Sequence, residues 1–182
     1  MRLNKDFFSH SCLEVAPALV GKIIFHRLPN GEILSLRITE TEAYNGESDT
    51  ACHAHKGKTK RNELLWREPG TVYVYLCYGM HWMLNAITGS EGVAEGVLIR
   101  ACQNQNGPGK LTKYLQIDKN LNGTSFESSD ELWIEDDGYS PTLREDTRIG
   151  INYAAPEDRE RRWRFIDIAS EQKKINNHRN SK

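Results

Sequence analysis

The sequence of 182 residues lacks the features that mark membrane, secreted and zinc-ribbon proteins. No stretch approaches the roughly 18 to 20 consecutive apolar residues that cross a bilayer, and the first ten residues have no signal-peptide apolar run. The four cysteines lie far apart without a CxxC pair, which argues against a zinc ribbon or a dense disulfide framework. We therefore expect a cytoplasmic protein with reduced thiols, no membrane contact, no metal and no other cofactor.

Net charge is also nearly absent, because 24 basic residues stand against 25 acidic ones. The field of the whole molecule therefore does not indicate a polyanionic partner. Basic side chains nevertheless gather in two segments, between His53 and Arg67 and over 159–164. Blocks of charge most often face solvent, so neither segment indicates a partner by itself.

The chain has enough apolar material for one core. Hydrophobic residues make up 38% of it and aromatic residues 9%, which is typical of a soluble globular protein. Its length fits one domain better than two. We expect a single domain over 1–169, followed by a polar tail over 170–182 that is disordered.

Local patterns predict few helices and a chain dominated by hairpin strands. Ser11 and Glu14 have the spacing of a capping box, which places the first helix over 12–20. Strands are predicted over 22–28, 33–42, 71–78, 81–88, 93–101, 132–135, 148–151 and 163–168, and short helices over 62–67 and 110–117. The expected class is α+β, a curved and mostly antiparallel sheet with a few short helices packed around it.

Two carboxylates follow the apolar positions of the strand predicted over 33–42. Leu36, Ile38, Glu40 and Glu42 have the same parity, so without a bulge their side chains lie on one face. The apolar face then leads directly into the carboxylates. We expect a carboxylate that is directed inward.

Tyrosines alternate along the strand predicted over 71–78. Tyr73 and Tyr75 share one face of that strand. Gly79 marks a bend that directs Tyr78 away from the sheet. The polar segment over 45–69 is long, and long loops in compact domains are often functional.

Tyrosine and histidine faces beside a carboxylate suit a pocket for a flat ring. Stacking accepts many rings, and one or two hydrogen bonds from residues such as Asn85 choose among them. A cationic ring, such as an alkylated purine, gains a further roughly 0.5 to 2 kcal/mol from tyrosine faces. A carboxylate at that wall can polarise a water and stabilise an oxocarbenium-like sugar while a glycosidic bond breaks.

Each feature taken singly also has an ordinary structural explanation. Alternating tyrosines are common in sheet packing, His53 fits a surface loop, and Arg100 fits an ion pair. The glycines at 107 and 109 open the helix predicted over 110–117, and such a helix N-terminus is a ready site for phosphate. These interpretations stay open at the level of single residues.

The ordered set of motifs resembles the mammalian-type family of 3-methyladenine (alkyladenine) DNA glycosylases. The matching motifs are ITETEAY over 38–44, ACH over 51–53, KRN over 60–62, PGTVYVY over 69–75, YGM over 78–80, LIRA over 98–101, GPGKL over 107–111 and RIG over 148–150. The resemblance covers about residues 5 to 168 in one order. Any single motif is weak, whereas the ordered set is highly specific.

The resemblance implies a catalytic centre around Glu42. Glu42 would be the general base that activates a water for attack on the anomeric carbon. Arg100 would hold that water and a nearby phosphate, and the backbone carbonyl of Ile149 would complete the water site. No lysine is placed to attack the sugar, so the enzyme implied is a monofunctional glycosylase that leaves an abasic site.

The resemblance also implies how a flipped base is held. Tyr44 would stack on one face with His53 beside it, Tyr75 would close the other face, and Tyr73 would support the wall. His53 would also bond the purine edge. The remaining roles fall to Asn85, which would clash with a 2-amino group, and Tyr78, which would fill the gap left in the duplex.

The implied partner is double-stranded DNA that contains damaged purines, bound by a monomer. The expected phosphate contacts are Lys58, Lys60, Arg61 and Lys110. The protein would act on DNA, in the nucleoid of a bacterium or the nucleus of a eukaryote. Two alternatives remain: a damaged-DNA-binding module without catalysis, and an enzyme acting on free nucleosides. The first leaves an inward Glu42 unexplained, and the second has no use for an exposed Tyr78.

Overall fold

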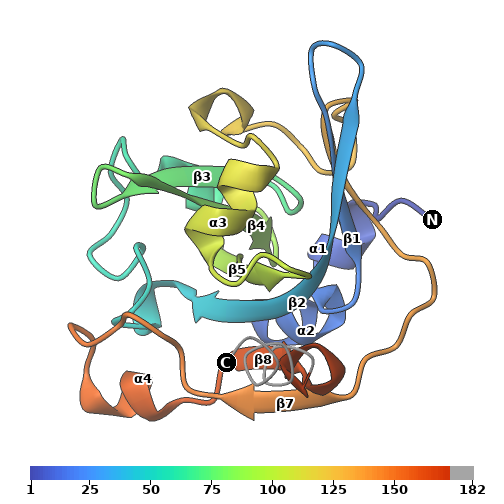
Figure 1. Cartoon of the computed structure of the whole chain (residues 1–182). Helices are drawn as coiled ribbons and strands as arrows, with labels where there is room; N and C mark the ends of the chain where they lie inside the picture. Colours follow the sequence, from blue (N-terminus) through green and yellow to red (C-terminus); the bar gives the residue numbers. More distant parts are fainter. Residues whose placement is uncertain (173–182) are drawn as a thin grey trace.

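The computed structural model describes residues 1–172, and its strands form one antiparallel sheet that curls on itself (Figure 1). The strands are β1 (Ile23–Arg27), β2 (Ile33–Asn45), β3 (Val72–Cys77), β4 (His81–Thr88), β5 (Glu95–Cys102), β6 (Leu132–Glu135), β7 (Leu143–Asp146) and β8 (Arg164–Asp167). They pair in the order β3-β4-β5-β2-β1-β6, while β8 pairs with β2 and β7 with β8. The predicted α+β class with a curved antiparallel sheet is confirmed.

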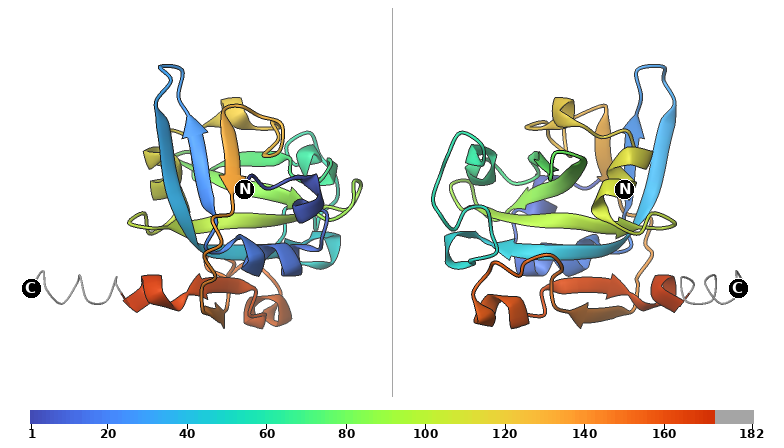
Figure 2. Two further views of the ribbon diagram at one scale, coloured as in Figure 1. Left: turned by 90° about the vertical axis from the view of Figure 1, so that its right-hand side faces the viewer. Right: turned by 60° about the vertical axis from the view of Figure 1, so that its left-hand side comes forward.

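β2 is the strand that joins the parts of this sheet. Its first half forms a projecting hairpin with β1, and its second half pairs with β5 and β8 (Figure 1). β7, β8 and α4 (Pro156–Glu160) lie together along one side of the molecule, beside β2 (Figure 2). The carboxyl end of β2 is therefore enclosed by two neighbours from distant parts of the chain.

Short helices cover the sheet. They are α1 (Lys5–Phe8), α2 (Cys12–Leu19), α3 (Pro108–Tyr114) and three turns of 3-10 helix at Gly46–Ser48, Glu63–Trp66 and Lys119–Leu121. The predicted capping box between Ser11 and Glu14 opens α2, which packs on β2 and β5. Among the described residues no helix has the length and apolarity needed to cross a membrane.

A β-bulge in β2 corrects the parity expected for the two carboxylates. The pairing of β2 with β5 shifts register between Ile38 and Thr41. Ile38 and Ala43 are five positions apart, an odd number, yet both belong to the main hydrophobic core. An extra residue in one strand reverses the alternation beyond it. Glu42 is therefore buried on the face opposite the core, and not in line with Ile38.

Other elements differ from the sequence predictions in places where side-chain pattern is a weak guide. Residues 148–151 form no strand, because Arg148 turns into the interior and Gly150 adopts a φ of 80°. The closing strand is β7 instead, whose polar sequence fits an edge position where charged side chains discourage further pairing. The helices α1 and α4 were not predicted, since each spans barely more than one turn.

The expected domain ends close to β8. Residues 168–172 continue helically after β8, and Glu171 there pairs with Arg144 of β7 at 2.6 Å. Most of the predicted polar tail, residues 173–182, lies outside the described residues. The single domain over 1–169 stays a prediction.

Candidate active site

The carboxylate of Glu42 is the centre of the site, and its side chain is fully buried. The hydroxyl of Tyr44 donates a hydrogen bond to Glu42 Oε2 at 2.8 Å. The backbone N–H of Ile149 donates to Glu42 Oε1 at 2.9 Å, and Arg100 Nε lies 3.4 Å from the same oxygen. Each oxygen thus faces at least one donor, and both retain accepting capacity.

Burial raises the pKa of Glu42 above its ordinary value, although three neighbours oppose that shift. The Ile149 N–H, the Tyr44 hydroxyl and the Arg100 charge each favour the ionised carboxylate. Burial likewise raises the pKa of Tyr44, so its hydroxyl remains a hydrogen-bond donor. A buried carboxylate with a raised pKa is typical of a general base.

An open pocket lies beside Tyr44, the residue whose hydroxyl bonds this carboxylate. Its walls carry the side chains expected to hold a flat ring, namely Tyr44, His53, Tyr73, Tyr75 and Asn85, together with Tyr153 and small residues. Tyr73 and Tyr75 come from β3 and their ring centroids are 5.5 Å apart. The structure therefore brings together the predicted base-binding residues around one pocket.

His53 packs with the β3 tyrosines. Its ring centroid lies 4.5 Å from that of Tyr75, and its Nδ1 lies 3.2 Å from the hydroxyl of Tyr73. His53 is exposed at the pocket rim, yet desolvation by the flanking rings lowers its pKa, and the charge of Arg61 adds to the shift. The imidazole is thus held in its neutral form, with one nitrogen able to accept a hydrogen bond.

Asn85 lies on β4 directly opposite Tyr73. Its side-chain amide donates to the backbone carbonyls of Tyr73 at 3.1 Å and Met83 at 3.3 Å. These two bonds fix the side chain in the pocket wall, where it is buried. A ring entering the pocket meets a rigid amide at that position.

Tyr78 lies at the tip of the β3–β4 hairpin, with 86% of its surface exposed. The N–H of Met80 donates to the carbonyl of Cys77 at 3.1 Å, which closes the turn. Tyr78 and Gly79 have φ values of 50° and 68°, as in a type I′ turn. The predicted outward direction of Tyr78 is confirmed, and its cause is this turn.

The basic side chains of the first segment face solvent. Lys58, Lys60, Arg61 and Lys110 are all exposed, and Lys58 lies 5.8 Å from the ring of Trp66. Asn62 holds the loop that carries three of them, since its amide donates to the carbonyls of His53 at 2.8 Å and Gly57 at 3.0 Å. The loop is thereby tied to the pocket residue His53.

The second basic segment is largely engaged within the protein. Arg161 pairs with Asp158 at 2.9 Å, Arg162 donates to the carbonyl of Glu145, and Arg164 pairs with Glu40 at 2.8 Å. These arginines fasten β8 and α4 to their neighbours. These three arginines therefore have partners within the protein: Glu40 and Glu145 lie far from them in the sequence, whereas Asp158 lies three residues before Arg161.

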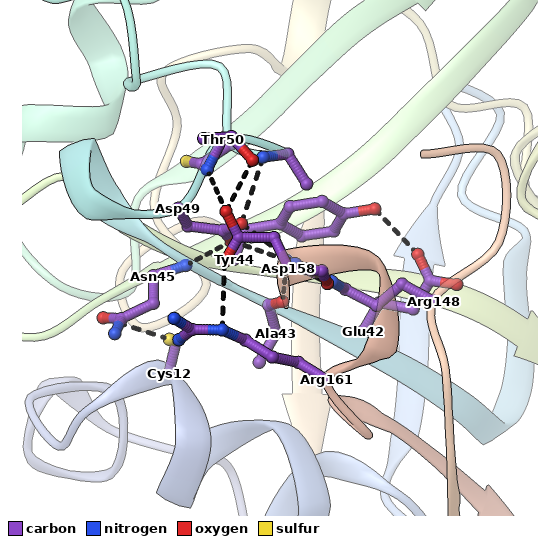
Figure 3. Close-up of polar contacts among 12 residues, drawn as sticks. Cys12, Glu42, Ala43, Tyr44, Asn45, Asp49, Thr50, Arg148, Asp158 and Arg161 are labelled. Atoms are coloured by element: carbon purple, nitrogen blue, oxygen red, sulfur yellow. Dashed lines mark hydrogen bonds and ion pairs between the residues drawn. The ribbon is translucent and has the colours of Figure 1, made fainter. Parts of the chain in front are cut away.

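Two functional features escaped the sequence reasoning. Tyr153 lines the pocket mouth, where its hydroxyl donates to the carbonyl of Ala51 at 2.8 Å. Arg148 and Asp49 form a fully buried ion pair behind Tyr44 (Figure 3). The RIG motif over 148–150 marked this arginine, but nothing local indicated that its side chain turns inward.

The arrangement is typical of proteins that hold a flat heterocycle beside a buried carboxylate. Comparison with known proteins gives a narrower answer. The methylpurine-DNA glycosylase (MPG) family matches residues 6–105 and 103–171, and the chain belongs to that family. The family expected from the ordered motifs is thereby confirmed.

Relatives resemble the chain over most of its length. A protein of Methanocella arvoryzae is 42% identical over 91% of this chain and 92% of its own length. Proteins of Clostridium perfringens strain SM101 and of Psychrobacter cryohalolentis are each 41% identical, covering 91% and 84% of this chain and 95% and 85% of their own lengths. All three are named "Putative 3-methyladenine DNA glycosylase".

Proposed function

We propose that this protein is a DNA glycosylase that removes damaged purines, chiefly alkylated ones, by hydrolysing the N-glycosidic bond. Family membership and the names of the relatives support the reaction and the class of base. The observation that supports the mechanism is the buried Glu42, which is bonded by the Ile149 N–H and by Tyr44, a residue that lines the aromatic pocket.

The resemblance alone put His53 beside Tyr44, but its ring lies 4.5 Å from that of Tyr75. The flipped base would therefore lie between Tyr44 on one side and the pair of His53 and Tyr75 on the other. Stacking on three aromatic rings tolerates many purines, and tyrosine faces favour a cationic one. The fixed amide of Asn85 lines the same pocket and would disfavour a ring with a 2-amino group. Neutral His53 would accept a hydrogen bond from the purine edge.

Glu42 would act as the general base. It accepts a proton from a water whose oxygen forms the new bond to the anomeric carbon, and the electron pair of the breaking bond leaves with the purine. Arg100, close to Glu42 Oε1, would orient the water and a flanking phosphate. The product is an abasic site with an intact strand, because no amine takes part.

Extrusion of the base leaves a gap in the duplex. Tyr78 at the exposed hairpin tip would fill that gap and offset unstacking of a few kcal/mol. Phosphates would be contacted by Lys58, Lys60 and Arg61 of the loop next to the pocket, and by Lys110 in the first turn of α3. One subunit supplies all these groups, so we propose that a monomer acts on double-stranded DNA in the cytoplasm or on the chromosome.

The test is base release from a duplex with one methylated purine, and from another with one hypoxanthine. The parent should release the base, while Glu42→Gln should bind the lesion but release it at least 100-fold more slowly, as expected for loss of a general base. Tyr44→Phe is the matched control, since it keeps the aromatic ring and removes only the hydrogen bond to Glu42. It therefore separates loss of that bond from loss of the Glu42 carboxylate. Borohydride should trap no enzyme–DNA adduct.

Several results would contradict this function. Equal rates of base release by the parent and Glu42→Gln would show that Glu42 is not the general base. A borohydride-trapped adduct would show that an amine of the protein, and not water, attacks the sugar. Tight lesion binding without release by the parent would indicate the binding module. Release from free nucleosides with no preference for duplex would indicate the nucleoside enzyme.

A further inference from the structure

We infer that Arg148 is a positioning residue that holds Tyr44 and the backbone N–H of Ile149 against Glu42. The inference rests on the proposed function, because it concerns the same carboxylate. Arg148 does not itself line the pocket, and its side chain bonds Asp49 and the carbonyls of Ala43 and Asp158. Its effect would reach Glu42 through the two groups that do bond the carboxylate.

The guanidinium of Arg148 is held by a fork of bonds to one carboxylate. Arg148 Nη1 lies 2.5 Å from Asp49 Oδ2, and Nη2 lies 2.9 Å from Asp49 Oδ1. Both side chains are fully buried (Figure 3). Asp49 also accepts the backbone N–H groups of Asn45 and Ala51 at 3.1 Å each, which fixes it to the end of β2. The pair is therefore rigid.

The same guanidinium reaches the two residues that follow Glu42 in β2. Arg148 Nη1 donates to the carbonyl of Ala43 at 2.9 Å, and Ala43 is the residue between Glu42 and Tyr44. The guanidinium also lies 4.8 Å from the ring centroid of Tyr44 and 5.0 Å from that of Trp163. One planar cation thus sets both the backbone between Glu42 and Tyr44 and the plane of the Tyr44 ring.

The neighbouring residue supplies the second link. Ile149 follows Arg148 directly, and its N–H donates to Glu42 Oε1 at 2.9 Å. Anchoring the Arg148 side chain therefore anchors the donor that lies one peptide away.

The loop that carries Arg148 has further anchors on the same part of β2. Asp158 accepts the N–H of Thr50 at 2.9 Å (Figure 3). The Thr50 hydroxyl in turn accepts the N–H of Ala155 at 2.8 Å. Arg148 Nη2 donates to the carbonyl of Asp158 at 3.2 Å. The loop and residues 49–51 therefore form one hydrogen-bonded unit around the buried fork.

Displacing this unit should change the protonation of Glu42 in a defined direction. The Ile149 N–H lowers the pKa of Glu42, so its loss leaves that pKa higher. The other titratable or charged groups around Glu42 come from four strands, and they are Glu40 and Tyr44 of β2, Tyr75 of β3, Arg100 of β5 and Arg164 of β8. A substitution at Arg148 leaves the identity of all these groups unchanged and acts on Glu42 through the position of Tyr44 and of the Ile149 N–H.

The test is Arg148→Lys, which keeps the charge beside Asp49 but cannot form the planar fork. Single-turnover base release should fall about 10- to 100-fold, the range expected when a catalytic group is displaced by about 1 Å. In the pH–rate profile of this variant, the pH at which activity is lost on the acidic side should be higher than for the parent. Binding of undamaged duplex should stay unchanged, since Arg148 is buried.

Arg37→Lys is the matched control. Arg37 forms an equivalent fork with Asp137 at 3.0 and 2.7 Å, on the half of β2 that pairs with β1. This control should leave both the rate and the acidic limb at the parent values. An equal shift in both variants would overturn the inference.

A purely structural role for Arg148 predicts a different result. The melting temperature and the active fraction would fall, while the acidic limb of the remaining activity stayed at the parent position. Should Arg148→Lys fail to fold, Asp49→Asn breaks the same fork with a near-isosteric side chain, and an unshifted limb there overturns the inference. Failure of the parent to release base, or release independent of Glu42, refutes the proposed function instead.

Discussion

The backbone conformation that places Tyr78 at the hairpin tip lowers the stability of the fold. Its φ of 50° lies in the left-handed region, which costs an ordinary L residue about 1 to 2 kcal/mol. The ring is 86% exposed, so removing it sacrifices little packing. Asparagine accepts this conformation, and Tyr78→Asn should therefore stabilise the fold by about 1 kcal/mol. For a chain of this size that raises the melting temperature by about 2 to 4 °C.

Thermal unfolding tests the backbone strain at Tyr78, and single-turnover base release measured on the same samples tests its role as a wedge. Tyr78→Ala is the matched control, because it removes the ring but keeps a Cβ in the strained conformation. Both variants should lose release from duplex DNA more than from single strands, and only Tyr78→Asn should melt higher than the parent. A melting temperature of Tyr78→Asn at or below that of Tyr78→Ala would refute the strain. Unchanged release from duplex would refute the wedge.

Two further predictions concern pH and salt. Because burial raises the pKa of Glu42 and the base must be ionised, release should be lost as pH falls through a pKa higher than that of an ordinary glutamate. The assay is a pH–rate profile corrected for spontaneous depurination, and a limb at the ordinary glutamate pKa would contradict it. Replacing Lys58, Lys60 and Arg61 by Gln should make the slope of log affinity against log salt less steep, by about 0.9 for each phosphate that these side chains neutralise. An unchanged slope would show that these three residues do not contact phosphates.

Predicting the local elements required only neighbouring residues. The capping box at Ser11, the alternation of tyrosines in β3 and the glycine after Tyr78 act over two to four positions, and each produced the predicted feature. The edge strand β7 and the inward turn of Arg148 were missed for the opposite reason. Their conformations are set by partners far along the chain, so the local pattern carries no trace of them.

The sequence by itself determined the antiparallel class, the family and five of the residues that line the pocket, but not Tyr153. Only the tertiary structure decided how Glu42 is placed. A bulge in β2 turns it away from the core, and its hydrogen-bond donor Ile149 comes from 107 residues further along the chain. The buried fork between Asp49 and Arg148 likewise joins residues 99 positions apart. Such pairings follow from the closure of the whole sheet, because a buried charge finds its partner only when distant segments pack together.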